Sequence, residues 1–194
     1  MTATEAELLE VIRARSFRQG SFRLASGDES DYYIDGKMTV VFGPGAALIG
    51  EVLYERTKDL GIDAIGGIEV GAVPLTTAAV IAYSQHGEAI EGFWVRDKAK
   101  THGTQKVIEG GLKKGMRVAI VDDVFTKGRS ALKAVQAVRE LGCEVVLVLA
   151  LVDRLSGARE LFRENQIDHY QAVFTIRDLG VGADVGGSVE VATR

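Results

Sequence analysis

The stretch that decides the fold is MRVAIVDDVFTKGRS, residues 116–130. Its apolar run, Val118-Ala119-Ile120-Val121, has the length and the β-branched residues typical of a strand buried on both faces of a parallel sheet. Asp122 and Asp123 follow at once. Because two unpaired carboxylates are costly to bury, we expect the strand to leave the core there. A polar turn, Thr126-Lys127-Gly128-Arg129-Ser130, then leads into a helical pattern.

This order of strand, acidic pair, polar turn and helix suits a phosphorylated sugar. Backbone N–H groups of the turn and of the helix N-terminus favour an anion, and Thr126 and Ser130 add hydroxyl donors. The carboxylates of Asp122 and Asp123 can accept hydrogen bonds from ribose hydroxyls. Because side chains alternate along a strand, both acids face one ligand only if the strand ends at them. The alternative is a ligand-free strand with acids at its solvent end.

The same stretch resembles the phosphoribosyl pyrophosphate (PRPP) motif of type I phosphoribosyltransferases. The shared pattern is an apolar run, two acids, two apolar residues and T-x-G-x-S. Lys127 and Arg129 stand where a small residue and Gly are more usual, and they add positive charge near the expected 5′-phosphate. The resemblance implies that PRPP contacts the whole segment, which comprises Asp122, Asp123, Val124, Phe125, Thr126, Lys127, Gly128, Arg129 and Ser130.

The composition excludes several classes of protein. The chain has 194 residues, 46% of them hydrophobic and 26% charged, which suits one α/β domain with a sizeable core. Its net charge of −4 argues against a general nucleic-acid binder. The single cysteine, Cys143, cannot form an internal disulfide and is expected to be a buried small residue. No signal peptide or bilayer-spanning run is visible, so a cytoplasmic protein that does not enter a membrane is expected.

Alternating strand and helix patterns predict a doubly wound, mostly parallel sheet with flanking helices. We expect one domain with a small N-terminal hood (about 1–42), a core (about 43–179) and a flexible Gly-rich tail (180–194). Thr4 and Glu7 predict a capping box for the first helix. The hood is expected to hold irregular strands, and residues 97–115 a long loop with a possible hairpin. Further helices are predicted at 43–60, 74–84 and 157–164 and over the helical pattern from Ala131 to Leu141, and strands at 62–68, 90–95, 116–123, 143–152 and 170–176.

Two loops resemble pyrophosphate-binding segments of the same family. Gly66 to Pro74 is a strand end, a tight turn and a helix start, and the resemblance places pyrophosphate at Val70 and Gly71. Arg96-Asp97-Lys98-Ala99-Lys100-Thr101-His102-Gly103 resembles the catalytic loop of orotate phosphoribosyltransferases, usually R-K-x-x-K-x-H-G. Asp97 replaces the first Lys, and Lys98 follows it. Without the resemblance, a solvated charged loop and a plain βα turn would be the better interpretations.

Two other segments resemble the orotate-binding part of that family. The hood contains F-R-L-A-S-G (22–27) and S-D-Y-Y-I-D (30–35), which implies that Tyr32 and Tyr33 meet the orotate ring. Arg154, after a predicted strand, would contact the orotate carboxylate, which a guanidinium fork fits well. Thr126 is also expected to lie near orotate. No P-loop or dinucleotide fingerprint is present.

The resemblance implies transfer of the 5-phosphoribosyl group from PRPP to orotate, which gives orotidine 5′-monophosphate and pyrophosphate. Arg96, Lys100, His102, Asp122 and Asp123 would be catalytic, with Lys98 a further PRPP contact. Mg²⁺ would be held mainly by PRPP and, at most, by the two acids. A homodimer is implied, with the 96–111 loop acting in the neighbouring subunit. Two alternatives remain open at this point: a phosphoribosyltransferase for another base, or a PRPP-sensing regulator that binds nucleic acid.

Overall fold

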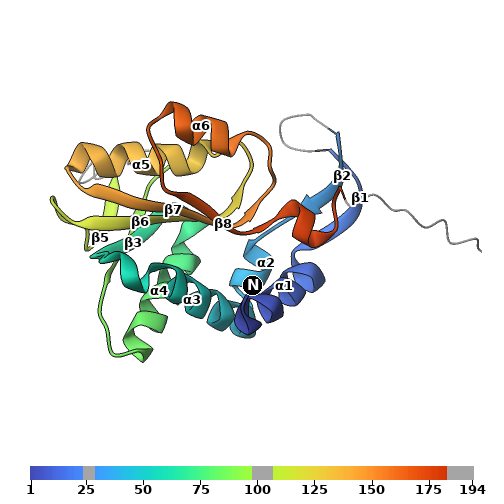
Figure 1. Ribbon diagram of the computed structural model, residues 1–194, viewed down its shortest axis with the longest axis horizontal. Helices are drawn as coiled ribbons and strands as arrows, with labels where there is room; N and C mark the ends of the chain where they lie inside the picture. The colour runs from blue at the N-terminus through green and yellow to red at the C-terminus, as the bar shows by residue number, and fades with distance from the viewer. Residues whose placement is uncertain (24–28, 98–106, 183–194) are drawn as a thin grey trace, which may run out of the picture.

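The computed structural model describes residues 1–23, 29–97 and 107–182, which are built around one six-stranded sheet (Figure 1). The strand order is β5-β4-β3-β6-β7-β8, and all neighbours are parallel except β4 and β5. The predicted α/β fold with a mostly parallel sheet is confirmed. In chain order, the elements are α1 (Ala3–Arg15), β1 (Phe17–Arg23), β2 (Glu29–Ile34), α2 (Lys37–Val40), α3 (Gly43–Thr57), β3 (Ala64–Ile68), α4 (Ala72–Gln85), β4 (Glu91–Val95), β5 (Ile108–Gly110), β6 (Arg117–Phe125), α5 (Arg129–Leu141), β7 (Glu144–Asp153), α6 (Ala158–Glu164) and β8 (Tyr170–Thr175), with 3₁₀ turns at Lys58–Leu60 and Ile176–Leu179.

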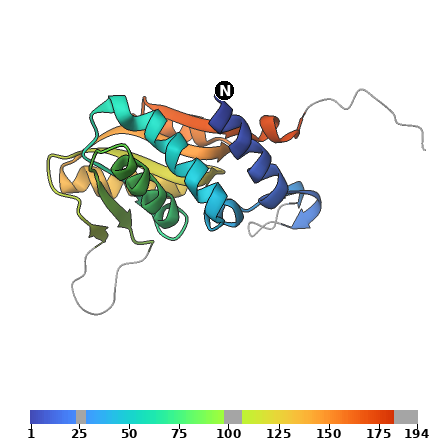
Figure 2. The ribbon, with the colours of Figure 1, turned by 90° about the horizontal axis from the view of Figure 1, so that it is seen from below.

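Helices cover both faces of this sheet. α1, α3 and α4 lie on one face, and α5 and α6 lie on the other (Figures 1 and 2). Ala119 and Val121 of β6 belong to the apolar cluster on the α3 and α4 side, whereas Val118 and Ile120 belong to the cluster on the α5 and α6 side. All four are at most 1% exposed. The central strand is therefore buried on both faces, as its apolar run predicts.

The N-terminal hood is more regular than its sequence indicates. β1 and β2 form an antiparallel hairpin with one irregularity between Gln19 and Phe22, and α2 follows. Helix α1 begins two residues earlier than expected, so the predicted Thr4–Glu7 capping box is wrong. Thr2 Oγ1 accepts the Glu5 N–H at 3.1 Å, and the Glu5 carboxylate accepts the Thr2 N–H at 2.9 Å. The earlier box also lets Glu5 pair with Arg56 of α3 at 2.6 Å.

The predicted end of the central strand is also wrong. β6 continues past the acids to Phe125, and its last residues, Val124 and Phe125, pair with Val152 and Asp153 of β7. The ladder with β3 ends earlier, at Gly66 and Ile120. β6 therefore runs beyond its shorter neighbour, and one of its edges is open beside the acids.

Other boundaries follow the sequence closely. α3 begins at Gly43 with Pro44 in its first turn, and its 3₁₀ extension ends at Gly61, which has a φ of 60°. A hairpin was expected within residues 97–115, but only one of its strands, β5, lies there; β5 pairs with β4, which ends before this range. Cys143 is 8% exposed and unpaired by any disulfide, as predicted. Of the predicted flexible tail, residues 183–194 lie outside the described part of the chain.

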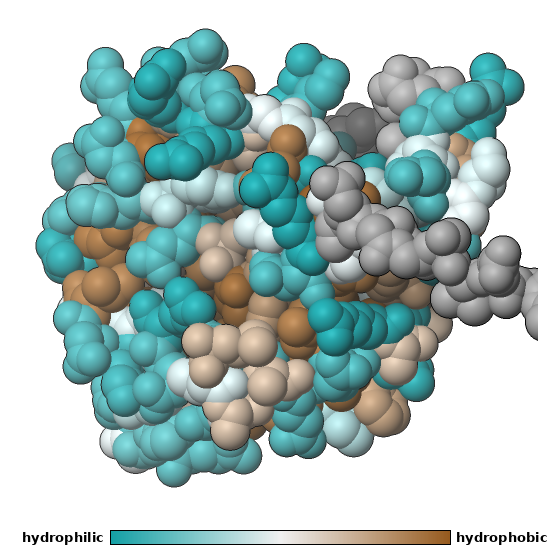
Figure 3. Space-filling model, turned by 45° about the vertical axis from the view of Figure 1, so that its right-hand side comes forward, coloured by the Kyte–Doolittle hydropathy of each residue, from teal (hydrophilic) through white to brown (hydrophobic). Residues whose placement is uncertain are grey.

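The face of the molecule shown in Figure 3 is mostly hydrophilic, with smaller apolar areas between polar side chains. Exposed apolar residues include Val41 and Val70, which are 72% and 70% exposed. Within the described ranges, no helix is both long enough and apolar enough to cross a bilayer.

Candidate active site

The acidic pair lies where the strand order reverses direction. β4 and β5 extend the sheet on one side of β3, whereas β6, β7 and β8 extend it on the other. α4 and α5, which follow β3 and β6, lie on opposite faces of the sheet (Figures 1 and 2). In sheets of this kind the ligand crevice is expected at such a point, between the carboxyl ends of β3 and β6. Asp122 and Asp123 meet Gly71 there: an ideal Cβ on Gly71 would lie 3.4 Å from Asp122 Oδ1 and 3.0 Å from Asp123 Oδ1.

Both carboxylates reach this point although the strand does not end at them. The Asp123 N–H donates to Asp122 Oδ1 at 3.0 Å, and the Val124 N–H donates to Asp123 Oδ1 at 2.9 Å. Each carboxylate thus bends along the edge of β6 that β3 has left open. We expected both acids to face one ligand only if the strand ended at them. This expectation is wrong, because β6 continues past the acids and its neighbour β3 ends instead.

The two acids differ in their surroundings. Asp122 is only 7% exposed. Burial, and then the charge of Asp123, raise the pKa of Asp122 to about 8, and the nearby Lys37 ammonium opposes this shift. The ligand-free pair therefore carries fewer than two negative charges at neutral pH. This lowers the repulsion that a polyanionic ligand meets.

The turn after β6 has the geometry of an anion site. Gly128 has a φ of 71°, and an ideal Cβ on it would lie 2.8 Å from Phe162 Cζ, so both conformation and space require glycine. Among the described residues, no side chain caps the N-terminus of α5, which leaves its first N–H groups available to a ligand. Exposed side chains border this turn, namely Thr126, Lys127, Arg129 and Ser130.

The two apolar residues of the motif lie differently. Phe125 is 1% exposed, and its ring packs against Phe162 and Tyr170 with centroid distances of 5.2 and 5.8 Å. Val124 is partly buried against the opposite apolar cluster. Phe125 can therefore contact PRPP only through its backbone.

The turn after β3 borders the same crevice from the other side. Val70 is exposed and Gly71 faces the acids. The Glu69–Val70 peptide bond is cis. The Glu69 carboxylate lies 3.8 Å from Arg96 Nη1, so this turn is linked to the base of the loop that follows β4.

Only the base of the predicted catalytic loop can be placed. Arg96 Nε and Nη2 donate to Glu109 Oε1 at 3.1 and 2.9 Å. Asp97, which replaces the usual Lys, accepts a hydrogen bond from Lys133 Nζ of α5 at 2.9 Å. Lys98, Lys100 and His102 lie outside the described residues, so their roles stay predictions.

The end of β7 joins the hood to the core. The Arg154 N–H donates to the Phe125 carbonyl at 2.9 Å, which sets Arg154 beside the end of β6. Its Nε donates to the Tyr32 hydroxyl at 3.1 Å, and its guanidinium carbon lies 4.7 Å from the centre of that ring. Tyr33 is on the other side of the strand, 42% exposed, with its ring 5.6 Å from Phe22. Of the two predicted aromatic contacts, Tyr32 is the one that touches Arg154.

Comparison with known proteins identifies the family of this chain. The sequence profile of the phosphoribosyl transferase domain matches residues 42–174. An orotate phosphoribosyltransferase of Bradyrhizobium diazoefficiens is 48% identical over 165 residues, covering 83% of this chain and 88% of that protein. One of Streptomyces coelicolor is 40% identical over 181 residues, covering 93% of this chain and 100% of that protein. The chain belongs to the orotate phosphoribosyltransferase family.

Solved structures of the orotate phosphoribosyltransferase family share the whole architecture. The Mycobacterium tuberculosis enzyme in complex with Fe(III) dicitrate is 41% identical, with a TM-score of 0.81 over 92% of this chain and 99% of its own. The same enzyme in complex with PRPP is 37% identical, with a TM-score of 0.77 and the same coverage. An adenine phosphoribosyltransferase of Leishmania tarentolae, 15% identical with a TM-score of 0.61, shares the fold alone. The fold is therefore common to enzymes named for different bases.

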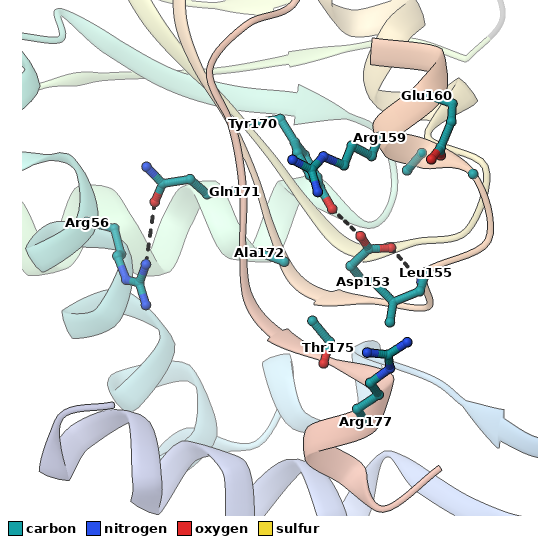
Figure 4. A pocket seen from close by; sticks show the side chains of 12 residues that line it. Arg56, Asp153, Leu155, Arg159, Glu160, Tyr170, Gln171, Ala172, Thr175 and Arg177 are labelled. Carbon is teal, nitrogen blue, oxygen red and sulfur yellow. Dashed lines mark hydrogen bonds between the residues drawn. The ribbon is translucent and has the colours of Figure 1, made fainter. Parts of the chain in front are cut away.

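A cavity of about 600 Å³ lies behind the loop that carries Arg154 (Figure 4). None of the predicted site residues lines it. Asp153 faces it, accepts a short hydrogen bond from the Tyr170 hydroxyl and accepts the Leu155 N–H at 2.8 Å. Burial, and then the hydrogen bond to Asp153, raise the pKa of Tyr170. We interpret the residues that line this cavity as a support for the turn that carries Arg154. We do not interpret the cavity as the reaction site.

Three contacts of the site escaped the sequence reasoning. Glu69 and Glu109 hold Arg96, and Asp153 holds the turn next to Arg154. Glu109 reaches Arg96 only because β4 and β5 pair as a hairpin. For Asp153 the signal was present, since an acid at a strand end beside a key Arg was visible in Val152-Asp153-Arg154.

Proposed function

We propose that this chain joins PRPP and orotate in the crevice between β3 and β6, using the residues assembled there. The reaction of its family is a pentosyl transfer that gives orotidine 5′-monophosphate and pyrophosphate in pyrimidine biosynthesis. The observation that carries the proposal is the convergence of the acidic pair, the phosphate turn and the Arg154–Tyr32 contact on one edge of the sheet.

The acids and the turn would position the phosphoribosyl group. Asp122 and Asp123 would accept hydrogen bonds from the ribose hydroxyls, and the N–H groups of the turn at Gly128 and of α5 would hold the 5′-phosphate. The transition state would place positive charge on the ribose ring, beside these carboxylates. Fixing the ribose in one orientation would supply much of the rate enhancement.

Arg154 would hold orotate against the hood. Its guanidinium is already oriented by the Tyr32 hydroxyl, so its fork could receive the orotate carboxylate with little loss of side-chain freedom. Tyr32 and, on closure of the hood, Tyr33 would meet the flat ring. Thr126 begins the phosphate turn directly after Phe125, whose carbonyl accepts the Arg154 N–H, and it would reach either substrate.

Mg²⁺ is proposed as the metal of the reaction. Within the described ranges, no three acidic, His or Cys side chains form a group that could hold a metal ion. The carboxylates of Asp122 and Asp123 are hard oxygen ligands and fit a Mg²⁺ that takes its other ligands from PRPP and water. Bound there, the ion would offset the negative charge that grows on the leaving pyrophosphate.

The leaving pyrophosphate would lie between the β3 turn and the loop after β4. Arg96 stands at the base of that loop, and exchange of its Glu109 partner for pyrophosphate would free its donors for the substrate. Lys100 and His102, with Lys98 beside them, are proposed to close over the same group and exclude water. The loop, residues 96–111, is proposed to act in the neighbouring subunit of a homodimer, and the enzyme is proposed to be cytoplasmic.

A panel of bases tests the proposal. Pyrophosphate release with PRPP and Mg²⁺ should require orotate and should be absent with uracil, adenine or hypoxanthine. Turnover with another base but not orotate would assign a different acceptor. No turnover with any base, together with retarded nucleic acid in a gel-shift assay, would favour a PRPP-sensing regulator instead.

A further inference from the structure

The Asp123 side chain is enclosed by two glycines that come from different parts of the fold. An ideal Cβ on Gly36, at the start of α2, would lie 2.7 Å from both Cβ and Oδ2 of Asp123. An ideal Cβ on Gly71, after β3, would lie 3.0 Å from Asp123 Oδ1. We call this narrow space the glycine slot. It leaves no room for a methyl group beside Gly36 unless Asp123 moves.

Space, and not backbone conformation, explains these glycines. Gly36 has φ −56° and ψ −31°, and Gly71 has φ −57° and ψ −43°, which any residue adopts. An alanine at either position would carry no backbone strain and would favour the helix that follows. The contact that a Cβ would disturb at Gly36 is the one with Asp123, the acid placed at the ribose.

The Gly36 turn is held rigidly to the core. The Asp35 N–H donates to the Ser16 carbonyl at 2.9 Å, and the Ser16 and Thr39 hydroxyls, both buried, lie 2.7 Å apart. The turn therefore cannot retreat easily if Asp123 is pushed against it. A wall of this kind can fix the carboxylate in one rotamer.

The same turn carries a cation, Lys37, directly after the glycine that packs against Asp123. Lys37 Nζ lies 2.8 Å from Asp35 Oδ1, which directs the side chain along the turn. The hydrogen bond to Asp35, and then the charge of Asp123, raise the pKa of Lys37 above its ordinary value. Its ammonium also acts on Asp122. Lys37 thus balances part of the negative charge of the pair that a polyanionic PRPP must approach.

We propose that Gly36 and Lys37 are positioning residues for Asp123: the glycine slot fixes the orientation of the carboxylate, and Lys37 offsets its charge. The inference rests on the proposed function, in which Asp123 binds the ribose of PRPP. It adds two hood residues to the site that binds the ribose, although the hood was expected to bind orotate.

The test compares Gly36→Ala with Gly43→Ala. Gly43 also begins a helix, and an ideal Cβ on it meets nothing within 4 Å. Gly36→Ala should lower kcat/KM for PRPP by roughly 10- to 100-fold, the scale for a misplaced catalytic contact, with an unchanged KM for orotate and an unchanged thermal midpoint. Gly43→Ala should resemble the wild type. Equal kcat/KM values for the two variants would overturn the proposed role of the glycine slot. A loss of kcat/KM in Gly36→Ala that is explained by a lower thermal midpoint would also overturn it.

The charge part is tested by Lys37→Met and Lys37→Arg, which decide the matter even if Gly36→Ala does not fold. Lys37→Met should weaken PRPP severalfold, and Lys37→Arg should restore most of it. Equal impairment of both would overturn the charge role. Calorimetric binding of PRPP with Mg²⁺ separates this inference from the proposed function. Weakened PRPP binding in Gly36→Ala or Lys37→Met supports the inference even if the wild type does not turn over orotate.

Discussion

Replacing Arg154 by Ala tests the orotate site most sharply. The change removes the guanidinium that donates to the Tyr32 hydroxyl, but it keeps the backbone N–H that donates to the Phe125 carbonyl at the end of β6. A hydrogen bond to a charged group contributes about 1.5–3 kcal/mol, which corresponds to a roughly 10- to 150-fold increase in the KM for orotate. Because Arg154 is only partly buried, solvent screening places the expected value in the lower half of that range.

The assay is steady-state turnover with each substrate varied while the other is saturating. The KM for orotate should rise, whereas the KM for PRPP should change less than threefold or so, since the acids and the phosphate turn are intact. Arg154→Lys should recover little, because a lysine keeps the charge but loses the fork and the Tyr32 contact. Arg163→Ala, an exposed arginine on α6, is the matched control and should behave as wild type. An unchanged KM for orotate with a raised KM for PRPP would move Arg154 to the phosphate side and refute the reasoning.

The remaining predictions concern the acids and the loop. Asp123→Asn should lose most activity but keep its fold, because its carboxylate is expected to orient the ribose; near-normal turnover would remove that role. Lys100→Ala should lower kcat by about 100-fold at saturating PRPP, the scale for one well-placed charge stabiliser, and Lys98→Ala far less; equal losses would mean that the loop register is misassigned. Mixed dimers of Lys100→Ala and Asp123→Asn subunits should recover activity, and dimers that stay inactive would place each loop in its own subunit. The folded pKa of Asp122, about 8, lies above its ordinary 3.8, so the folded state keeps a proton that the unfolded state has released. Stability of the ligand-free protein should therefore fall as pH rises from about 4 to about 8. Asp122→Asn should reduce this fall in thermal melts, and an unchanged pH profile would contradict the assigned pKa.

Much of the fold could be predicted because its signals are local. The run from Val118 to Val121 has no polar residue, which indicates a strand buried on both faces. The apolar residues that follow Ser130 recur at helical spacing, which predicts the buried face of a helix. The acids and the phosphate turn could be located for the same reason: charge and glycine at fixed spacing after a buried strand restrict the possible structures. Arg154 needed more, since its identification rests on its position after β7 in a family pattern.

What could not be predicted depends on contacts between distant segments. The strand continues beyond Asp123 because β7 pairs with it after β3 has ended, and no local pattern records where a neighbour ends. The same holds for Glu109, brought to Arg96 by a hairpin, and for Gly36, whose small size matters only because Asp123 lies against it. Both Thr2 and Thr4 fit a capping box with Glu three residues on, so sequence alone could not choose between them.

The central claim is that this crevice joins PRPP to orotate. The most direct measurement is the absorbance of orotate in the presence of PRPP and Mg²⁺, with pyrophosphate quantified in the same samples. The account predicts a loss of orotate that requires both PRPP and Mg²⁺, equals the pyrophosphate released and disappears in Asp123→Asn. Constant orotate absorbance with the folded wild-type protein at saturating PRPP would contradict it.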